Sequence, residues 1–251
     1  MSYAHARGPY DASTAPEETR ADLIDGYLEY RATTGGDGAS AISVGAATLG
    51  SDPDAEETGV DPGYQLDDTN VRAPDLAVGN VPARVGWISG APPLAVEYAS
   101  RGHDEEKLQE KIGLLLARGT RWVWVVRLLG PRRVEVFSSS GVELFTPGDL
   151  LHAPGVLKNP IPVEALYDRS VADEVILRNL LEKHGYGSLA SVEERGREEG
   201  REEGREEGLR TAVRVFLAEP SAEELERLSR SRAPALLEWL ETLKQTVGAK
   251  P

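Results

Sequence analysis

The sequence predicts an α/β fold in which a central mixed β-sheet is flanked by helices and followed by a charged helical tail. Residues 94–98 and 122–128 are apolar apart from one charged residue each, as is typical of strands covered on both faces. The segment after Asp104 repeats apolar residues at helical spacing, which is typical of a helix that lies on a sheet. Gly119 is expected to end this helix. Beyond residue 168 a Gly-Arg-Glu-Glu repeat replaces these patterns, which indicates a separate region.

Length and composition limit the possible sites. The 251 residues suffice for one sizeable core, and we divide them into a flexible N-terminus (1–15), a main domain (16–168) and a helical tail (169–251). The chain contains no cysteine, which excludes disulfides, thiol catalysis and thiolate metal sites. Any metal would therefore be a hard cation such as Mg²⁺, bound by oxygen atoms.

The charge is unevenly distributed. A net charge of −14 argues against a general nucleic-acid binder, because such binding depends on Lys and Arg that neutralise phosphates. Residues 1–70 contain three Arg against fourteen acidic residues, whereas residues 71–135 contain ten Lys and Arg against seven. The first thirty residues lack the pattern of a signal peptide, and no stretch approaches the roughly 20 apolar residues of a membrane helix. We expect a cytoplasmic protein without a membrane partner.

The N-terminal elements follow from local signals. Residues 13–18 resemble a helix start, with a proline and two acidic residues in the first turn. Residues 21–30 predict two short elements joined by a turn at Asp25-Gly26, a strong hairpin signal. The small-residue run 39–49 fits a helix or a strand equally well.

The later elements are more regular. In the strand 94–98 the inward residues are either Ala95 and Glu97 or Leu94 and Val96. Further strands are expected at 134–137 and 142–145, and a helix at 171–184. The repeat within 192–210 is either a solvated charged helix or spacer, or a self-associating coiled coil.

Two acidic residues interrupt the apolar runs. Asp75 and Glu97 stand among residues expected to be inside, and a buried carboxylate is costly unless it is paired or bound to a cation. Two carboxylates from adjacent strands with a nearby lysine suit metal-dependent phosphodiester hydrolysis. Ala99 occupies the position two residues after Glu97 where such a lysine often stands, so the following helix must supply it. On a helical wheel Lys111 borders the apolar face and Lys107 lies nearer solvent, so we prefer Lys111.

Structural explanations exist for the same residues. Asp75 follows a proline and fits a turn. In a structural explanation, Glu97 forms an ion pair with Arg101 or Lys111. Lys111 is then an amphipathic side chain on the helix surface that extends its charged end to solvent.

Several short motifs occur in a characteristic order, namely Leu23-Ile-Asp-Gly26, Pro74-Asp75, Pro92-Pro-Leu-Ala-Val-Glu97 with Ser100, Lys111, and Gly119 followed by Trp124. Over residues 16–168 this order resembles the Uma-type restriction endonuclease family of the PD-(D/E)XK nuclease-like superfamily. The resemblance implies a restriction-endonuclease-like fold in which Asp75 and Glu97 are metal ligands. It also implies that Asp22, before the Leu-Ile-Asp-Gly motif, is an accessory carboxylate.

The sequence departs from this family at three places. Leu115 stands where an aromatic residue is usual, Thr120 stands where Val is usual, and no histidine occurs between Gly35 and Gly50. These departures concern the expected substrate contacts more than the metal site.

Three functions remain. The first is an endonuclease that depends on Mg²⁺ (or Mn²⁺) and cleaves DNA as a homodimer, using Asp75, Glu97, Lys111 and Asp22. The second is a catalytically inactive protein of the same fold that assembles through its helical tail. The third is a nuclease acting on RNA or branched DNA. Metal binding separates the first from the second, because only an active site has reason to keep two inward carboxylates.

Overall fold

The computed structural model describes residues 8–16, 21–31, 33–100, 104–217 and 219–248. Internal contacts divide the chain into two units, Met1–Gly185 and Tyr186–Pro251. This division falls after the predicted boundary at residue 168, because helix α3 (Arg169–Lys183) packs against helix α1 (Gly36–Ser51) of the first unit. Parts of the expected flexible N-terminus and of the helix start at 13–18 lie outside the described residues.

A mixed six-stranded sheet forms the centre of the first unit. Its order is β11-β10-β9-β8-β6-β3, and only β8 and β9 run parallel. All six residues of β8 are buried, including Glu97, as the largely apolar sequence of this strand predicted. The strands are β3 (Thr58–Val60), β6 (Leu76–Val78), β8 (Leu94–Ala99), β9 (Trp122–Arg127), β10 (Arg133–Ser138) and β11 (Gly141–Phe145).

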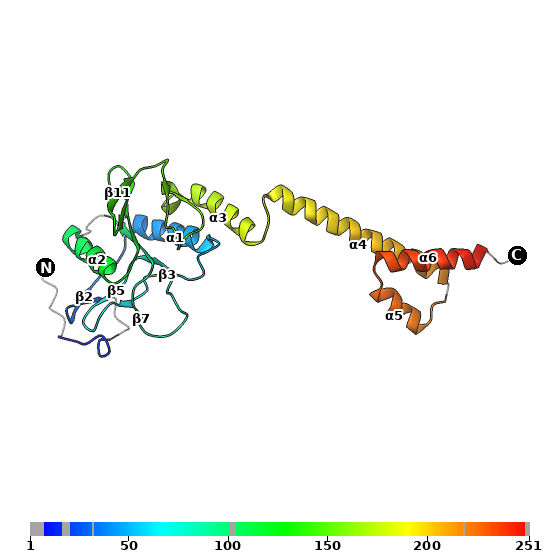
Figure 1. Ribbon diagram of the computed structural model, residues 1–251, viewed down its shortest axis with the longest axis horizontal. Helices are drawn as coiled ribbons and strands as arrows, with labels where there is room; N and C mark the ends of the chain where they lie inside the picture. The colour runs from blue at the N-terminus through cyan, green and yellow to red at the C-terminus, as the bar shows by residue number, and fades with distance from the viewer. Residues whose placement is uncertain (1–7, 17–20, 32, 101–103, 218, 249–251) are drawn as a thin grey trace. The chain divides into compact units, whose positions relative to one another are not determined.

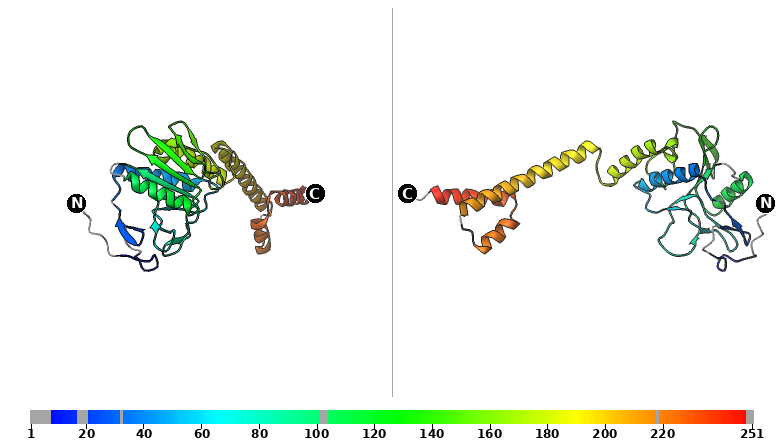
Figure 2. Two further views of the ribbon diagram at one scale, coloured as in Figure 1. Left: turned by 60° about the vertical axis from the view of Figure 1, so that its left-hand side comes forward. Right: turned by 180° about the vertical axis from the view of Figure 1, so that it is seen from behind.

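Helices cover both faces of this sheet. Leu94, Val96 and Tyr98 share a core with residues of α1 and α3, which lie side by side (Figures 1 and 2). Ala95 and Ala99 pack instead with helix α2 (Glu105–Ala117). Because side chains alternate along a strand, Glu97 also belongs to the α2 face. Both alternatives for the inward positions of β8 are therefore correct, one on each face.

A smaller five-stranded sheet has the order β2-β1-β5-β4-β7. The predicted hairpin is confirmed, since β1 pairs antiparallel with β2 across Asp25 and Gly26, which both have positive φ. The strands are β1 (Ala21–Ile24), β2 (Tyr27–Tyr30), β4 (Tyr64–Gln65), β5 (Val71–Arg72) and β7 (Ile88–Ser89). The chain then adds a two-stranded sheet, β12 (Leu150–Leu151) and β13 (Ile161–Pro162), and a short 3-10 helix, η1 (Val163–Leu166).

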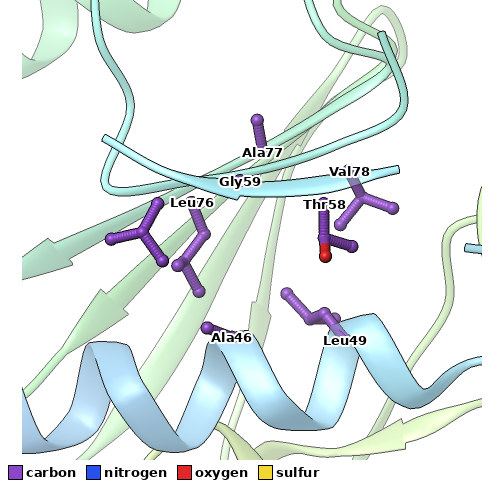
Figure 3. A pocket seen from close by; sticks show the side chains of 8 residues that line it. Ala46, Leu49, Thr58, Gly59, Leu76, Ala77 and Val78 are labelled. Carbon is purple, nitrogen blue, oxygen red and sulfur yellow. The ribbon is translucent and has the colours of Figure 1, made fainter. Parts of the chain in front are cut away.

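The run 39–49, which fitted either a helix or a strand, lies within helix α1. Its small residues allow a close approach, because a Cβ atom at Gly45 would lie 1.9 Å from the Tyr98 hydroxyl oxygen. That hydroxyl donates a 2.9 Å hydrogen bond to the Leu166 carbonyl. On the neighbouring part of the helix, Ala46 and Leu49 point toward β3 and β6 around a cavity of about 90 Å³ (Figure 3).

The second unit consists of helices α4 (Leu189–Leu217), α5 (Ala222–Arg230) and α6 (Ala233–Gly248). Its core contains Val213, Leu228, Leu236 and Leu240. The Gly-Arg-Glu-Glu repeat forms a largely exposed part of α4, so its helical character is confirmed and the coiled coil stays a prediction. No helix in the described part of the chain is both long and apolar enough to span a membrane.

Candidate functional site

A cleft of about 330 Å³ opens between the β1–β2 hairpin, strand β8 and helix α2. The four residues predicted for the site, Asp22, Asp75, Glu97 and Lys111, all line it. They come from four different segments of the chain, so tertiary folding brings them together. Their roles in a reaction stay predictions.

Glu97 and Lys111 form an ion pair at the base of this cleft. The Lys111 Nζ lies 2.6 Å from the Glu97 Oε1 atom and also donates a 2.8 Å hydrogen bond to the Ala73 carbonyl. The side chains are only 4% exposed for Glu97 and 13% for Lys111. Lys111 reaches this position because it borders the face of α2 whose residues Leu108 and Ile112 are buried.

The pair sits in an acidic and largely dry environment. Burial, together with nearby Asp75 and Asp22, raises the pKa of Glu97 to about 7 against the opposing effect of Lys111. Burial alone would lower the pKa of Lys111, but Glu97, Asp22 and Asp75 outweigh it and raise that pKa. Lys111 therefore carries its charge at neutral pH, and a further positive charge near Glu97 would favour the carboxylate form.

Asp75 lies beside Glu97 because of the strand register. Leu76 of β6 is paired with Val96 of β8, so Asp75, the residue before Leu76, is opposite Glu97. The Tyr98 backbone N–H donates a 2.7 Å hydrogen bond to the Asp75 Oδ2 atom. This bond crosses to the neighbouring strand, so the role of Asp75 is not limited to a local turn.

Asp22 enters the cleft from β1 and is 9% exposed. Its Oδ1 atom lies 3.3 Å from the Arg31 Nε atom, and Arg31 also pairs with Asp61. Sequence analysis missed Arg31. The only sequence signal for Arg31 was its position directly after the second strand of the hairpin, because that strand runs back beside the strand that carries Asp22. Arg72, also missed, is buried and donates a 2.7 Å hydrogen bond to the Leu23 carbonyl.

Lys107 occupies the outer part of the cleft. Its side chain is 53% exposed and pairs with Glu29 of β2. The helical-wheel placement of Lys107 nearer solvent than Lys111 is therefore confirmed. Arg101, the other partner considered for Glu97, lies outside the described residues.

The donor atoms of the cleft suit a hard divalent cation. No group of three or more potential metal-ligating residues occurs among the residues with described positions. Mg²⁺, however, is commonly held by one or two carboxylates, with water and substrate phosphates as its other ligands. Asp75 and Glu97, adjacent in register and lining the same cleft, match this smaller requirement.

The sequence matches no protein-family model and no curated protein. Among solved structures, the fold of this chain is similar to that of a protein from Anabaena variabilis ATCC 29413, whose crystal structure is described as that of a candidate nuclease belonging to DUF820. The TM-score is 0.55 at 19% identity, over 65% of this chain and 99% of the other. The chain has the restriction-endonuclease-like α/β fold. At this identity the likeness shows the fold alone, and the Uma-type assignment stays a prediction.

Proposed function

We propose that this protein is a metal-dependent nuclease that hydrolyses phosphodiester bonds in DNA. One observation carries the proposal, namely that Asp75, Glu97 and Lys111 converge in a single cleft from three separate segments of the chain. The likeness of the fold to a candidate nuclease supports it.

In this proposal Asp75 and Glu97 hold Mg²⁺ or Mn²⁺. Such a cation, when bound, polarises a phosphate and lowers the pKa of a coordinated water. The hydrogen bond from the Tyr98 backbone N–H orients the Asp75 carboxylate toward β8 before any ligand arrives. Asp22, which pairs with Arg31 in the same cleft, acts as an accessory carboxylate.

Lys111 supplies positive charge to the reacting phosphate. Its ammonium group is held by the Glu97 carboxylate and the Ala73 carbonyl, so little reorganisation is needed when a phosphate enters the cleft. Preorganised charge in a site with little water stabilises the negative charge that develops in the transition state.

A purely structural role accounts poorly for this arrangement. A buried ion pair is often no more stabilising than well-packed apolar residues, because both charges lose their hydration. The Glu97–Lys111 pair also lines an open cleft, and Asp22 and Asp75 add further acidic charge beside it. Binding of a cation offsets this accumulated negative charge.

The decisive experiment combines metal binding with cleavage. Calorimetry with Mg²⁺ and Mn²⁺, beside nicking of supercoiled plasmid DNA, is done on the wild type, Asp75→Ala and Glu97→Ala. We expect the wild type to bind metal and nick DNA and both variants to do neither. Glu143→Ala, on the exposed strand β11, is the matched control and should behave as the wild type.

A wild type that binds neither metal would contradict the proposal. That result would favour the catalytically inactive alternative, in which the helices of residues 186–251, with their own apolar core, mediate assembly. Substituting RNA for plasmid DNA in the same assay separates DNA from RNA as the substrate.

A further inference from the structure

A second cleft, of about 550 Å³, adjoins the candidate site. Both clefts are lined by Arg31, Thr33, Thr34 and Asp75, so the second one continues from the first past a proposed metal ligand. Its volume lies within the range of about 300–1,000 Å³ that is usual for small-molecule sites. The proposed reaction does not itself require this space.

The walls of the second cleft are mainly apolar. Ala39, Ile42, Ser43 and Ala46 of α1 line one side, at the spacing of a single helix face. Val60 of β3 lines the other side, and Figure 3 shows Ala46 pointing from α1 toward this strand. Three of the four helix residues have short side chains and leave the space between helix and strand unfilled.

The rim of the second cleft is polar. Thr33 and Thr34 supply hydroxyl groups at the end nearest Asp75, and Arg31 supplies a guanidinium group that pairs with Asp61, a carboxylate that also lines the cleft. A flat ligand with an apolar face and a hydrogen-bonding edge matches apolar walls below such a rim. A nucleobase has this chemistry.

We propose that the second cleft binds the nucleobase next to the scissile phosphate, and that the substrate is single-stranded or locally unpaired DNA. The inference rests on the proposed nuclease function, because Asp75 connects the two clefts. A base stacked inside a duplex cannot enter a pocket without leaving the stack, and this costs least where the strand is already unpaired.

The charges of the site support a substrate held by its base. Arg31 pairs with Asp22 and Asp61, Lys107 with Glu29, and Lys111 with Glu97. Arg72, the remaining cation that lines the candidate site, is buried and donates a hydrogen bond to the Leu23 carbonyl. Little exposed positive charge therefore remains for phosphates, whose neutralisation supplies most of the affinity of duplex-binding proteins. Contacts to a base contribute affinity without such charge.

The test fills the second cleft and measures binding rather than cleavage. Ser43→Phe places a large side chain at an exposed position of α1 that lines the cleft. Ala47→Phe adds a ring on the same helix at an exposed position outside the cleft, and is the matched control. Fluorescence anisotropy with a labelled single-stranded oligodeoxynucleotide, its duplex, and a base-free deoxyribose phosphate oligomer is recorded with a chelator present.

We expect the wild type to bind the single strand more tightly than either the duplex or the base-free oligomer. Ser43→Phe should weaken binding of the single strand about tenfold, the effect of losing one base contact, and leave the base-free oligomer unaffected. Ala47→Phe should bind as the wild type does.

Unchanged binding by Ser43→Phe, or a preference for the duplex, would overturn the inference even if plasmid nicking succeeds. Conversely, Ser43-dependent binding without any metal-dependent nicking would contradict the proposed nuclease activity while supporting the base-binding cleft. The two proposals therefore fail in different ways.

Discussion

Among the described residues, each unit of the molecule buries one glutamate, and the two glutamates are held in different ways. Glu97 of β8 is 3% exposed and pairs with one cation, Lys111. Glu206 of α4 is 5% exposed and has three partners, because it pairs with Arg210 and Arg232 and accepts a hydrogen bond from the Ala233 backbone N–H.

The pKa directions reflect this difference. Burial raises the pKa of Glu97 to about 7, since Lys111 only partly opposes it. Burial also acts to raise the pKa of Glu206, but the Ala233 N–H and the two arginines outweigh it and the pKa is lowered. Glu206 is thus satisfied by its own unit and joins α4 to the start of α6. Glu97 has a raised pKa because burial disfavours its charged form, and it faces a cleft, as a ligand-binding group does.

One glycine from each unit shows a similar contrast in packing. Gly45 in α1 lies so close to the Tyr98 hydroxyl that no side chain fits. Gly200 in the repeat of α4 has open space where a Cβ atom would stand. Packing therefore constrains the residue at position 45 and leaves position 200 free to vary.

The largest effect is expected from breaking the buried pair on one side only. Lys111→Met leaves Glu97 without its cation and should lower the free energy of unfolding by about 3–5 kcal/mol. The double variant Glu97→Leu/Lys111→Met should recover most of this loss, because apolar residues often replace a buried pair without cost. Urea denaturation of both variants measures the difference. A double variant as unstable as the single one would mean that the pair is structural.

The next effect concerns cleavage. Lys111→Gln should reduce plasmid nicking by about 10²–10³-fold, the usual cost of removing one group that stabilises developing charge. Lys107→Gln, the matched change at the exposed partner of Glu29, should retain nearly full activity. Nicking rates of both variants, with circular dichroism to confirm folding, compare the two lysines. Equal losses would contradict the assignment of Lys111.

The glycine contrast predicts stability changes of opposite sign. Gly45→Ala should lower the free energy of unfolding by about 1–3 kcal/mol through overpacking against Tyr98. Gly200→Ala should raise the stability of α4 by about 0.5–1 kcal/mol, because alanine favours helix and meets no neighbour. Thermal unfolding followed by circular dichroism measures both. Destabilisation by Gly200→Ala would indicate that the repeat packs against something.

The smallest effect is expected from acid on the second unit. A carboxylate whose pKa is lowered in the folded state contributes stability above its ordinary pKa, and this contribution is lost as pH falls through the lowered value. The protection of α6 amides from hydrogen exchange, corrected for the intrinsic exchange rate at each pH, should therefore fall below about pH 4.5, the ordinary value. Glu206→Gln should flatten this dependence. An unchanged pH profile in that variant would show that another group is responsible.

Local patterns in the sequence predicted several elements correctly. The Asp25-Gly26 turn has the positive φ angles that a tight hairpin needs, so the hairpin could be predicted from two residues. Asp104 precedes helix α2 and its side chain caps the helix, whose 3.6-residue period placed Lys111 beside the buried face. Such signals lie within one element and need no knowledge of its neighbours.

For the run of residues 39–49, local sequence patterns did not decide between a helix and a strand. Its small residues carry weak preferences, and its close approach to β8 depends on Tyr98, a residue far along the chain. The pairing of Arg31 with Asp22 and Asp61, and the cleft left between α1 and β3, likewise depend on separate elements meeting.

The sequence by itself determined the type of the main elements, because periodicity, caps and turn residues act over a few neighbours. It also indicated Asp75, Glu97 and Lys111, because charges within apolar patterns stand out. Only the tertiary structure decided which side chains meet. The register that sets Asp75 opposite Glu97, and the helix packing that leaves a second cleft, arise from contacts between distant residues.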